Sequence, residues 1–258
     1  MANPDVPRLF DHAALRLRRA RAERIGPAAF LLETACSDLA ERLDVVRRTF
    51  TAVVDIGTPA EGLRGRLTER AASVDWIDLF APAGESLKLA AQSIDLAVSA
   101  LALQFANDLP GVFAQVRRAL KPDGLFLAAM IGGDSLSELR QAFAVAETER
   151  DGGLSPRVAP MTDVRDLGAL LQRAGFALPV TDSDRLVVRY DNVFGLMNDL
   201  RRMGATNILA ERRRLSLRRA TLRRMAAIYA ERFSDPDGRI RATFDILWLS
   251  GWAPHESQ

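Results

Sequence analysis

The residues best placed for chemistry lie where apolar runs end. Asp55 and Gly57 close the run VVDIG, and Asp78 closes the run VDWID, with Asp75 as the alternative acid. In an open parallel sheet the carboxyl ends of the strands share one crevice, and an acid after the second strand commonly holds a ribose. Glycine lets the backbone approach a ligand with no Cβ in the way. A DxG after a strand is common by itself, but together these residues indicate a nucleotide-type ligand site.

Two further strand ends complete the predicted site. Gln104 and Asn107 follow the apolar run SIDLAVSALAL, and Gly132 and Gly133 follow GLFLAAMI. These loops should all meet at one edge of the sheet. The predicted cofactor-binding residues are Asp55, Gly57, Gly62, Asp78, Gln104 and Asn107.

The sequence assigns no catalytic residue and predicts no metal. Asp108 and Glu138 are available carboxylates, but both suit helix capping better. Histidine occurs only as His12 and His255, at opposite ends of the chain, and Cys36 is the single cysteine. A zinc centre, a Ser-His-Asp triad and a Cys-His pair are therefore not expected at the centre of the fold.

The composition is that of an ordinary globular chain. Its 258 residues are 48% hydrophobic and 26% charged, and no apolar run reaches the roughly 18 residues that a membrane span needs. The start lacks the basic-then-apolar pattern of a secretory signal. The Arg-rich stretch 8–24 faintly resembles a mitochondrial presequence, but Asp11 and Glu23 interrupt it. We expect a bacterial, cytoplasmic protein.

The charge of the chain argues against a nucleic-acid partner but allows an acidic protein or an anionic membrane as partner. A net charge of +2 predicts no nucleic-acid partner. Locally, ERRRLSLRRATLRRM carries seven arginines, with leucines near helical spacing, which predicts a basic amphipathic helix over 211–225. Such a face is either solvated or docks an acidic partner or an anionic membrane, which would place the protein at the periphery of the inner membrane.

Turn signals separate alternating strands and helices. Strands are expected at 51–57, 72–80, 93–105, 124–133, 181–190 and 240–252, and helices over much of 8–50 and at 63–71, 108–120, 164–175, 192–204 and 211–225. Ser135 and Glu138 predict a capping box for one more helix. The alternation predicts a doubly wound, Rossmann-like α/β sheet. We expect a helical extension over 1–50 and a sheet domain over 51–258, with a helical insertion at about 192–235.

The order of motifs resembles a known superfamily. With DxG first and LKPDG before a strand, the chain resembles the class I S-adenosylmethionine-dependent methyltransferases. Within them it resembles the methyltransferase-like assembly factor of respiratory complex I. The motifs that carry this resemblance are ALALQFANDLPG, LKPDGLFLAAMIGGDSLSELR, AETERDGGLSPRVAP, LLQRAGFALPVTDSD, LMNDLRRMGATN and GWAPHESQ. The match is close over 95–258 and weaker in LFDHAALRLRRARAERI.

The resemblance implies a fold, a cofactor and a partner. These are the class I methyltransferase fold, S-adenosylmethionine, and a complex I subunit as the protein substrate. In that family the proposed reaction is hydroxylation of an arginine on the quinone-module subunit rather than methyl transfer. A neighbouring family of the superfamily methylates malonyl-acyl carrier protein in biotin synthesis, and this activity stays an alternative.

The chain departs from the family in its cofactor loop, which resembles DLGCGxG elsewhere. Pro59 replaces the second glycine and Glu61 the third, unless Gly62 takes that role. Proline adds a ring and removes an N–H donor, and we expect Glu61 to add negative charge beside the site. Gln104 and Phe105 stand where the family favours a His-Trp pair.

Spacing gives a second departure. Only 40 positions separate Asp55 from Asp95 (95 − 55), whereas two βαβ units in series need about 50 to 60 residues. We therefore expect a shortened sheet edge, with the usual third strand missing or reduced to APAGESLKLAAQ. Two functions remain open: an enzyme that binds S-adenosylmethionine, and a non-catalytic assembly scaffold with a degenerate cofactor pocket.

Overall fold

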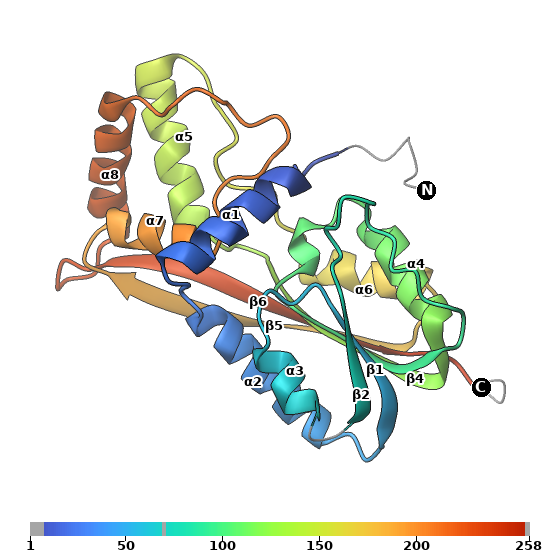
Figure 1. Cartoon of the computed structure of the whole chain (residues 1–258). Coiled ribbons are helices and arrows are strands. Elements are labelled where there is room, and N and C mark those ends of the chain that lie inside the picture. The colour runs from blue at the N-terminus through green and yellow to red at the C-terminus, as the bar shows by residue number, and fades with distance from the viewer. Residues whose placement is uncertain (1–7, 69–70, 256–258) are drawn as a thin grey trace.

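A single six-stranded sheet forms the centre of the protein (Figure 1). The computed structural model describes residues 8–68 and 71–255. The strand order is β2-β1-β3-β4-β6-β5; the first four are parallel, and β6 runs antiparallel to both of its neighbours. The strands are β1 (Phe50–Ile56), β2 (Ala71–Ile77), β3 (Ile94–Ala100), β4 (Leu120–Gly132), β5 (Ala177–Tyr190) and β6 (Ile240–Trp252). The expected doubly wound Rossmann-like sheet is confirmed.

Helices cover both faces of this sheet (Figure 1). They are α1 (His12–Ile25), α2 (Phe30–Asp44), α3 (Gly62–Thr68), the 3₁₀ helix η1 (Leu103–Phe105), α4 (Leu109–Ala119), α5 (Ser137–Asp151), α6 (Val164–Arg173), α7 (Val193–Arg202) and α8 (Arg219–Phe233). One apolar cluster joins the sheet to α2, α3, α5, α7 and α8, and another joins it to α1, α4 and α6. Strand β3 is buried along its whole length, as a parallel strand covered on both faces should be.

The expected shortening of the sheet edge is also confirmed. Residues 78–93 contain no helix or strand, so β2 is the outer strand on this side. Side-chain hydrogen bonds fix this segment instead. The carboxylate of Glu85 accepts from the backbone N–H groups of Asn107 and Asp108, and Gln115 accepts from the N–H of Leu87.

The predicted capping box is wrong. Helix α5 begins at Ser137, and Leu136 stands at its N-cap in the left-handed conformation with no side-chain cap. The hydroxyl of Ser135 instead donates to the carbonyl of Gly132 and accepts from the N–H of Asp245. Ser135 therefore contacts a distant strand instead of capping the helix, as its local spacing predicts. The other predicted cap, Asp108, does accept from the N–H of Gly111 at the start of α4.

The predicted basic helix over 211–225 is wrong in its first half. Residues 211–218 are irregular, and α8 begins only at Arg219. The reason is tertiary: Arg212 pairs with Asp11, and Arg213 and Arg218 lie near the carboxylate of Asp151. These ion pairs neutralise part of the expected basic face. Membrane contact through this segment stays a prediction. Among the described residues no helix is long and apolar enough to cross a bilayer.

The expected division of the chain into a helical extension, a sheet domain and a helical insertion stays a proposal. Helices are nevertheless present in both segments that were expected to be helical. Helices α1 and α2 precede β1, and α7 and α8 lie between β5 and β6. Both groups contribute to the apolar clusters on the sheet, because Leu39 of α2 and Leu196 of α7 are buried in the same cluster. The part of the tail beyond His255 lies outside the described residues.

Candidate functional site

The candidate site is a cavity of about 450 Å³ at the carboxyl ends of the strands. Pro59 and Ala60 after β1, Gln104 and Phe105 after β3, and Ile131 near the end of β4 line one side. Residues of α1, α2, α5, α7 and the segments 157–161 and 205–208 line the rest. The volume lies in the range of small-molecule sites, and the position is where open α/β sheets bind ligands.

Of the six predicted cofactor residues, Gln104 alone lines this cavity. Gly57 is buried and does not line the cavity; its φ is 72°, and a Cβ there would lie 3.1 Å from the Cβ of Ala102 and 3.2 Å from that of Leu79. The glycine is therefore needed for the turn that ends β1.

Asp55 is fully buried and does not line the cavity. Its Oδ2 accepts from Nη1 of Arg64 at 3.1 Å, while its Oδ1 has no hydrogen-bond partner among the described residues. Burial raises the pKa of this carboxyl group, and the nearby Thr58 and Arg64 counter only part of that rise. Asp55 is therefore a buried carboxyl group whose ionised form is only partly stabilised, and its contact with Arg64 anchors the start of α3.

The degenerate loop is less obstructive than its sequence indicates. Pro59 lines the cavity, but the side chain of Glu61 is 94% exposed and lies 3.9 Å from Arg64. The expectation that Glu61 adds negative charge to the site is therefore wrong, because the turn into α3 directs this residue to solvent. Gly62 is exposed at the first position of α3. Its assignment as a cofactor contact stays a prediction.

Asp78 lies after β2, outside the cavity. Its Oδ1 accepts from the N–H of Phe80, and Phe80 is buried against Phe105 with ring centroids 6.5 Å apart. The guanidinium of Arg19 from α1 lies over both rings, 5.1 Å from the Phe80 centroid and 6.0 Å from that of Phe105. This aromatic–arginine cluster lies between the end of β2 and the end of β3.

Asn107 holds the start of α1 in place. Its Oδ1 accepts from the N–H of Phe10 at 2.7 Å, and its Nδ2 donates to the carbonyl of the same residue at 3.2 Å. His12 is next to it, with Nε2 2.8 Å from the carbonyl oxygen of Phe105 and 3.3 Å from Glu85. Asn107 thereby fixes the helix that covers the site. Direct contact with a cofactor stays a prediction.

Arg19 is the polar residue of this site that sequence reasoning missed. Its Nη2 is buried without a hydrogen-bond partner, as is Oε1 of Gln104, and both side chains line the cavity. A buried group left unpaired costs about 1–3 kcal/mol. Burial lowers the pKa of Arg19 to about 10, against the opposing charge of Asp78. The Arg-rich stretch 8–24 was the available signal, but nothing in it singles out one arginine.

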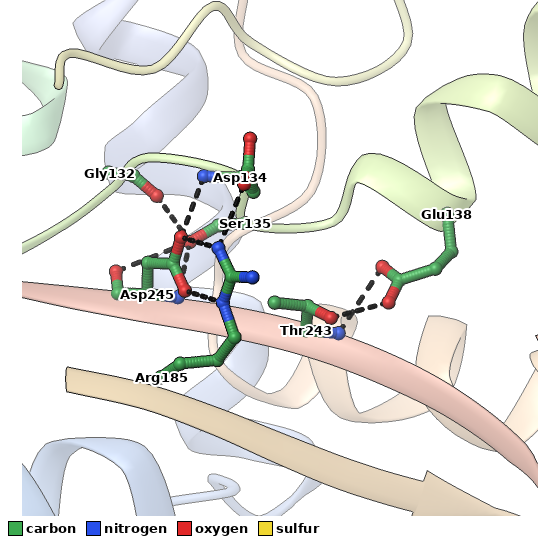
Figure 2. Close-up of polar contacts among 7 residues, drawn as sticks. All are labelled: Gly132, Asp134, Ser135, Glu138, Arg185, Thr243 and Asp245. Atoms are coloured by element: carbon green, nitrogen blue, oxygen red, sulfur yellow. Dashed lines mark hydrogen bonds and ion pairs between the residues drawn. The ribbon is translucent and has the colours of Figure 1, made fainter.

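A second polar cluster lies at the carboxyl end of β4, beside β6 (Figure 2). Asp245 accepts from Nε of Arg185 at 2.8 Å, from Nη2 at 2.9 Å and from the N–H of Asp134 at 2.8 Å. Burial opposes ionisation of Asp245, but these donors outweigh it and lower the pKa. Gly133 is required here, because its φ is 56° and a Cβ would lie 2.6 Å from Oδ2 of Asp245.

This network positions one wall of the cavity. Figure 2 shows Glu138 of α5 pointing to Thr243 of β6, whose N–H and hydroxyl both donate to its carboxylate. Leu136 and Leu139, on either side of Glu138, line the cavity. The groups of this cluster are satisfied by one another, so we assign it a supporting role.

The described residues include no group of three or more His, Cys, Asp or Glu side chains close enough together to hold a metal ion. The polar side chains that line the cavity are those of arginines, Gln104, Asn207, Thr206 and Glu23. Guanidinium and amide groups suit the amino-acid portion of S-adenosylmethionine. Asp78 is the acid after β2 and lies outside the cavity.

The fold and the site define a class: the protein has a class I methyltransferase fold with a small-molecule cavity at the usual edge. Residues 32–128 match the model of a family described as a methyltransferase domain. A solved structure of a candidate methyltransferase from Bacillus halodurans C-125 is similar, with a TM-score of 0.56 at 13% identity over 85% of this chain and 100% of that one.

The comparison with curated relatives is more specific. The mitochondrial arginine-hydroxylase NDUFAF5 of Danio rerio is 38% identical over 247 residues, which cover 89% of this chain and 77% of that protein. The malonyl-[acyl-carrier protein] O-methyltransferase of Laribacter hongkongensis is 36% identical over 277 residues, 95% of this chain and 87% of that protein. The chain belongs to the methyltransferase-like family that contains the NDUFAF5 arginine hydroxylases.

Proposed function

We propose that this protein is an assembly factor of respiratory complex I that binds S-adenosylmethionine and modifies an arginine of a quinone-module subunit. The observation that supports it most is the match to the zebrafish arginine-hydroxylase along 89% of the chain. At that coverage the match extends beyond the methyltransferase core into the segments that build the cavity wall.

Different residues around the cavity would bind the cofactor and the substrate arginine. Pro59, Ala60, Gln104 and Arg19 line the cavity and would hold the amino-acid end of the cofactor. Asp78 lies outside the cavity, after β2, and stays the predicted acid for the ribose. When bound, S-adenosylmethionine would supply an electrophilic methyl group at this edge; addition of an oxygen atom to an arginine is a two-electron oxidation and needs a separate oxidant that also provides the oxygen. Glu23, which is exposed where it lines the cavity, is the carboxylate available to receive a cationic arginine side chain.

Gene deletion separates the two enzymatic candidates. We expect a deletion strain to lose NADH oxidation by its membranes and to grow without added biotin. Mass spectrometry of the quinone-module subunits should then show an arginine that lacks the mass of one oxygen atom relative to wild type. A biotin requirement with normal NADH oxidation would contradict the proposal and favour carrier-protein methylation. This alternative is supported by the 36% identity to the Laribacter enzyme.

A further inference from the structure

Strand β2 is the last strand of the sheet on its side, and its outer edge is exposed (Figure 1). None of its seven residues is buried, and Trp76 is 47% exposed. The segment 78–93 stands where a further strand would cover this edge, but Glu85 and Gln115 tie it to α4. Within residues 8–68 and 71–255, no hydrogen bond joins this segment to β2.

Three residues of β2 direct their backbone hydrogen-bonding groups away from the sheet. The carbonyl of Ile77 accepts from the N–H of Gly57 at 2.9 Å, on the β1 side. The N–H and C=O of one residue point to the same side of a strand, and this side alternates from residue to residue. The backbone groups of Ala72, Val74 and Trp76 therefore point outward. Unpaired groups of this kind are a template for a further strand.

The opposite edge of the sheet is protected by charge, whereas β2 is not. Charged side chains commonly keep an edge strand from pairing with another chain. Strand β5 carries four exposed charges, on Asp182, Asp184, Arg185 and Arg189. Strand β2 carries only Asp75, whose backbone groups point to β1. Of the two edges, β2 is therefore the one suited to pairing with a partner strand.

The sequence of β2 complements itself. We propose that β2 pairs antiparallel with β2 of a second copy of this chain, centred on Val74, and joins the two sheets into one. Val74 then faces its own counterpart and Ala72 faces Trp76, so every outward group is paired. Ser73 faces Asp75, so no two like charges meet. A register centred on Asp75 would place two carboxylates opposite each other, and one centred on Ser73 would carry Trp76 past the end of the strand.

The side chains agree with this pairing. Ala72, Val74 and Trp76 share one face of the strand, so the exposed ring of Trp76 lies beside the small Ala72 of the second copy. The guanidinium of Arg64 is 5.5 Å from the centroid of the Trp76 ring and holds it from one side. Removal of this ring from water stabilises the pair. The inference goes beyond the proposed function, because the pairing needs neither cofactor nor substrate.

The oligomeric state of the full-length protein tests the pairing. Light scattering over a concentration series should show a monomer–dimer equilibrium for wild type. Val74→Lys sets two like charges opposite each other and should raise the dissociation constant about tenfold or more. Val74→Pro should act in the same direction and keep the β1–β2 pairing, because the N–H that it removes points outward. Val187→Lys, at an exposed position of β5, should leave the equilibrium unchanged.

Disulfide formation tests the register, in a background where the buried Cys36 is replaced by serine. Facing Cα atoms of a hydrogen-bonded antiparallel pair are about 5.5 Å apart, within reach of a disulfide, whereas diagonal neighbours are about 7–8 Å apart. Val74→Cys should therefore crosslink to a dimer under mild oxidation much faster than Ser73→Cys, its exposed neighbour. Equal rates at the two positions would overturn the register.

Three results would overturn the proposal. A wild type that stays monomeric throughout the series does so, and leaves the edge to a strand of another protein. A dimer that withstands both Val74→Lys and Val74→Pro has its interface elsewhere. A dimer that is lost in Val187→Lys alone has its interface at β5. None of these results bears on cofactor binding, so the proposed function stands or fails separately.

Discussion

Two buried aspartates at the same edge of the sheet have opposite environments. Asp55 at the end of β1 has one partner, an unpaired oxygen and a raised pKa. Asp245 of β6, opposite Gly132 at the end of β4, is held by Arg185 and the N–H of Asp134 and has a lowered pKa. The Asp245 cluster on β4, β5 and β6 is satisfied by its own groups, whereas Oδ1 of Asp55 in β1 and Oε1 of Gln104 after β3 are buried without a partner among the described residues. The difference indicates a rigid frame beside a site that a ligand completes.

Asp245→Ala should give the largest effect. The change removes the acceptor of Nε of Arg185 and of the N–H of Asp134, and we expect a loss of about 2 kcal/mol in the free energy of unfolding. Urea denaturation measures it. Asp134→Ala removes an exposed partner of the same arginine and should cost much less. Equal effects of the two variants would show that the frame does not depend on the buried carboxylate.

Acid titration sharpens the same comparison. Because the folded-state pKa of Asp245 lies below its unfolded value near 3.9, its contribution is present above that value and is lost as pH falls through the folded pKa. Unfolding midpoints measured between pH 2 and 6 should therefore show a weaker acid-side loss in Asp245→Ala than in wild type. An unchanged acid limb would contradict the assigned ion pair.

Pro59→Gly tests the modified loop. A glycine returns an N–H donor and removes the ring from the cavity wall, so affinity for S-adenosylhomocysteine should rise several-fold. The unfolded chain gains freedom, and stability should fall by about 1 kcal/mol. Calorimetric titration and thermal unfolding report the two changes separately. Unchanged affinity would mean that Pro59 does not limit cofactor binding.

Asp55→Asn should give the smallest change in stability at pH 7, within about 1 kcal/mol. It removes a buried charge and weakens the contact with Arg64, and these effects oppose each other. The raised folded-state pKa means that wild type loses stability as pH rises from about 3.9 through the folded pKa. The variant should lack that loss, and denaturation at pH 4 and 7 measures it. A parallel pH profile would contradict the environment assigned to Asp55.

Local patterns were enough to predict the sheet but not the site. Strand β6 has the predicted bounds, and the short spacing after Asp55 indicated the missing edge strand, because both follow from patterns within the chain. Ser135 and the segment 211–218 were mispredicted because their partners, Asp245 and Asp11, are distant in sequence. The same limit hid Arg19, since only tertiary packing brings α1 over Phe105.

The most direct measurement asks whether the cavity is needed for function. Ala60 is exposed and lines the cavity, whereas Ala13 is exposed on α1 and does not. In a deletion strain, Ala60→Trp should accumulate normally yet fail to restore NADH oxidation by membranes, while Ala13→Trp should restore it. Full restoration by Ala60→Trp would contradict the account and leave the protein as a scaffold whose cavity is not used.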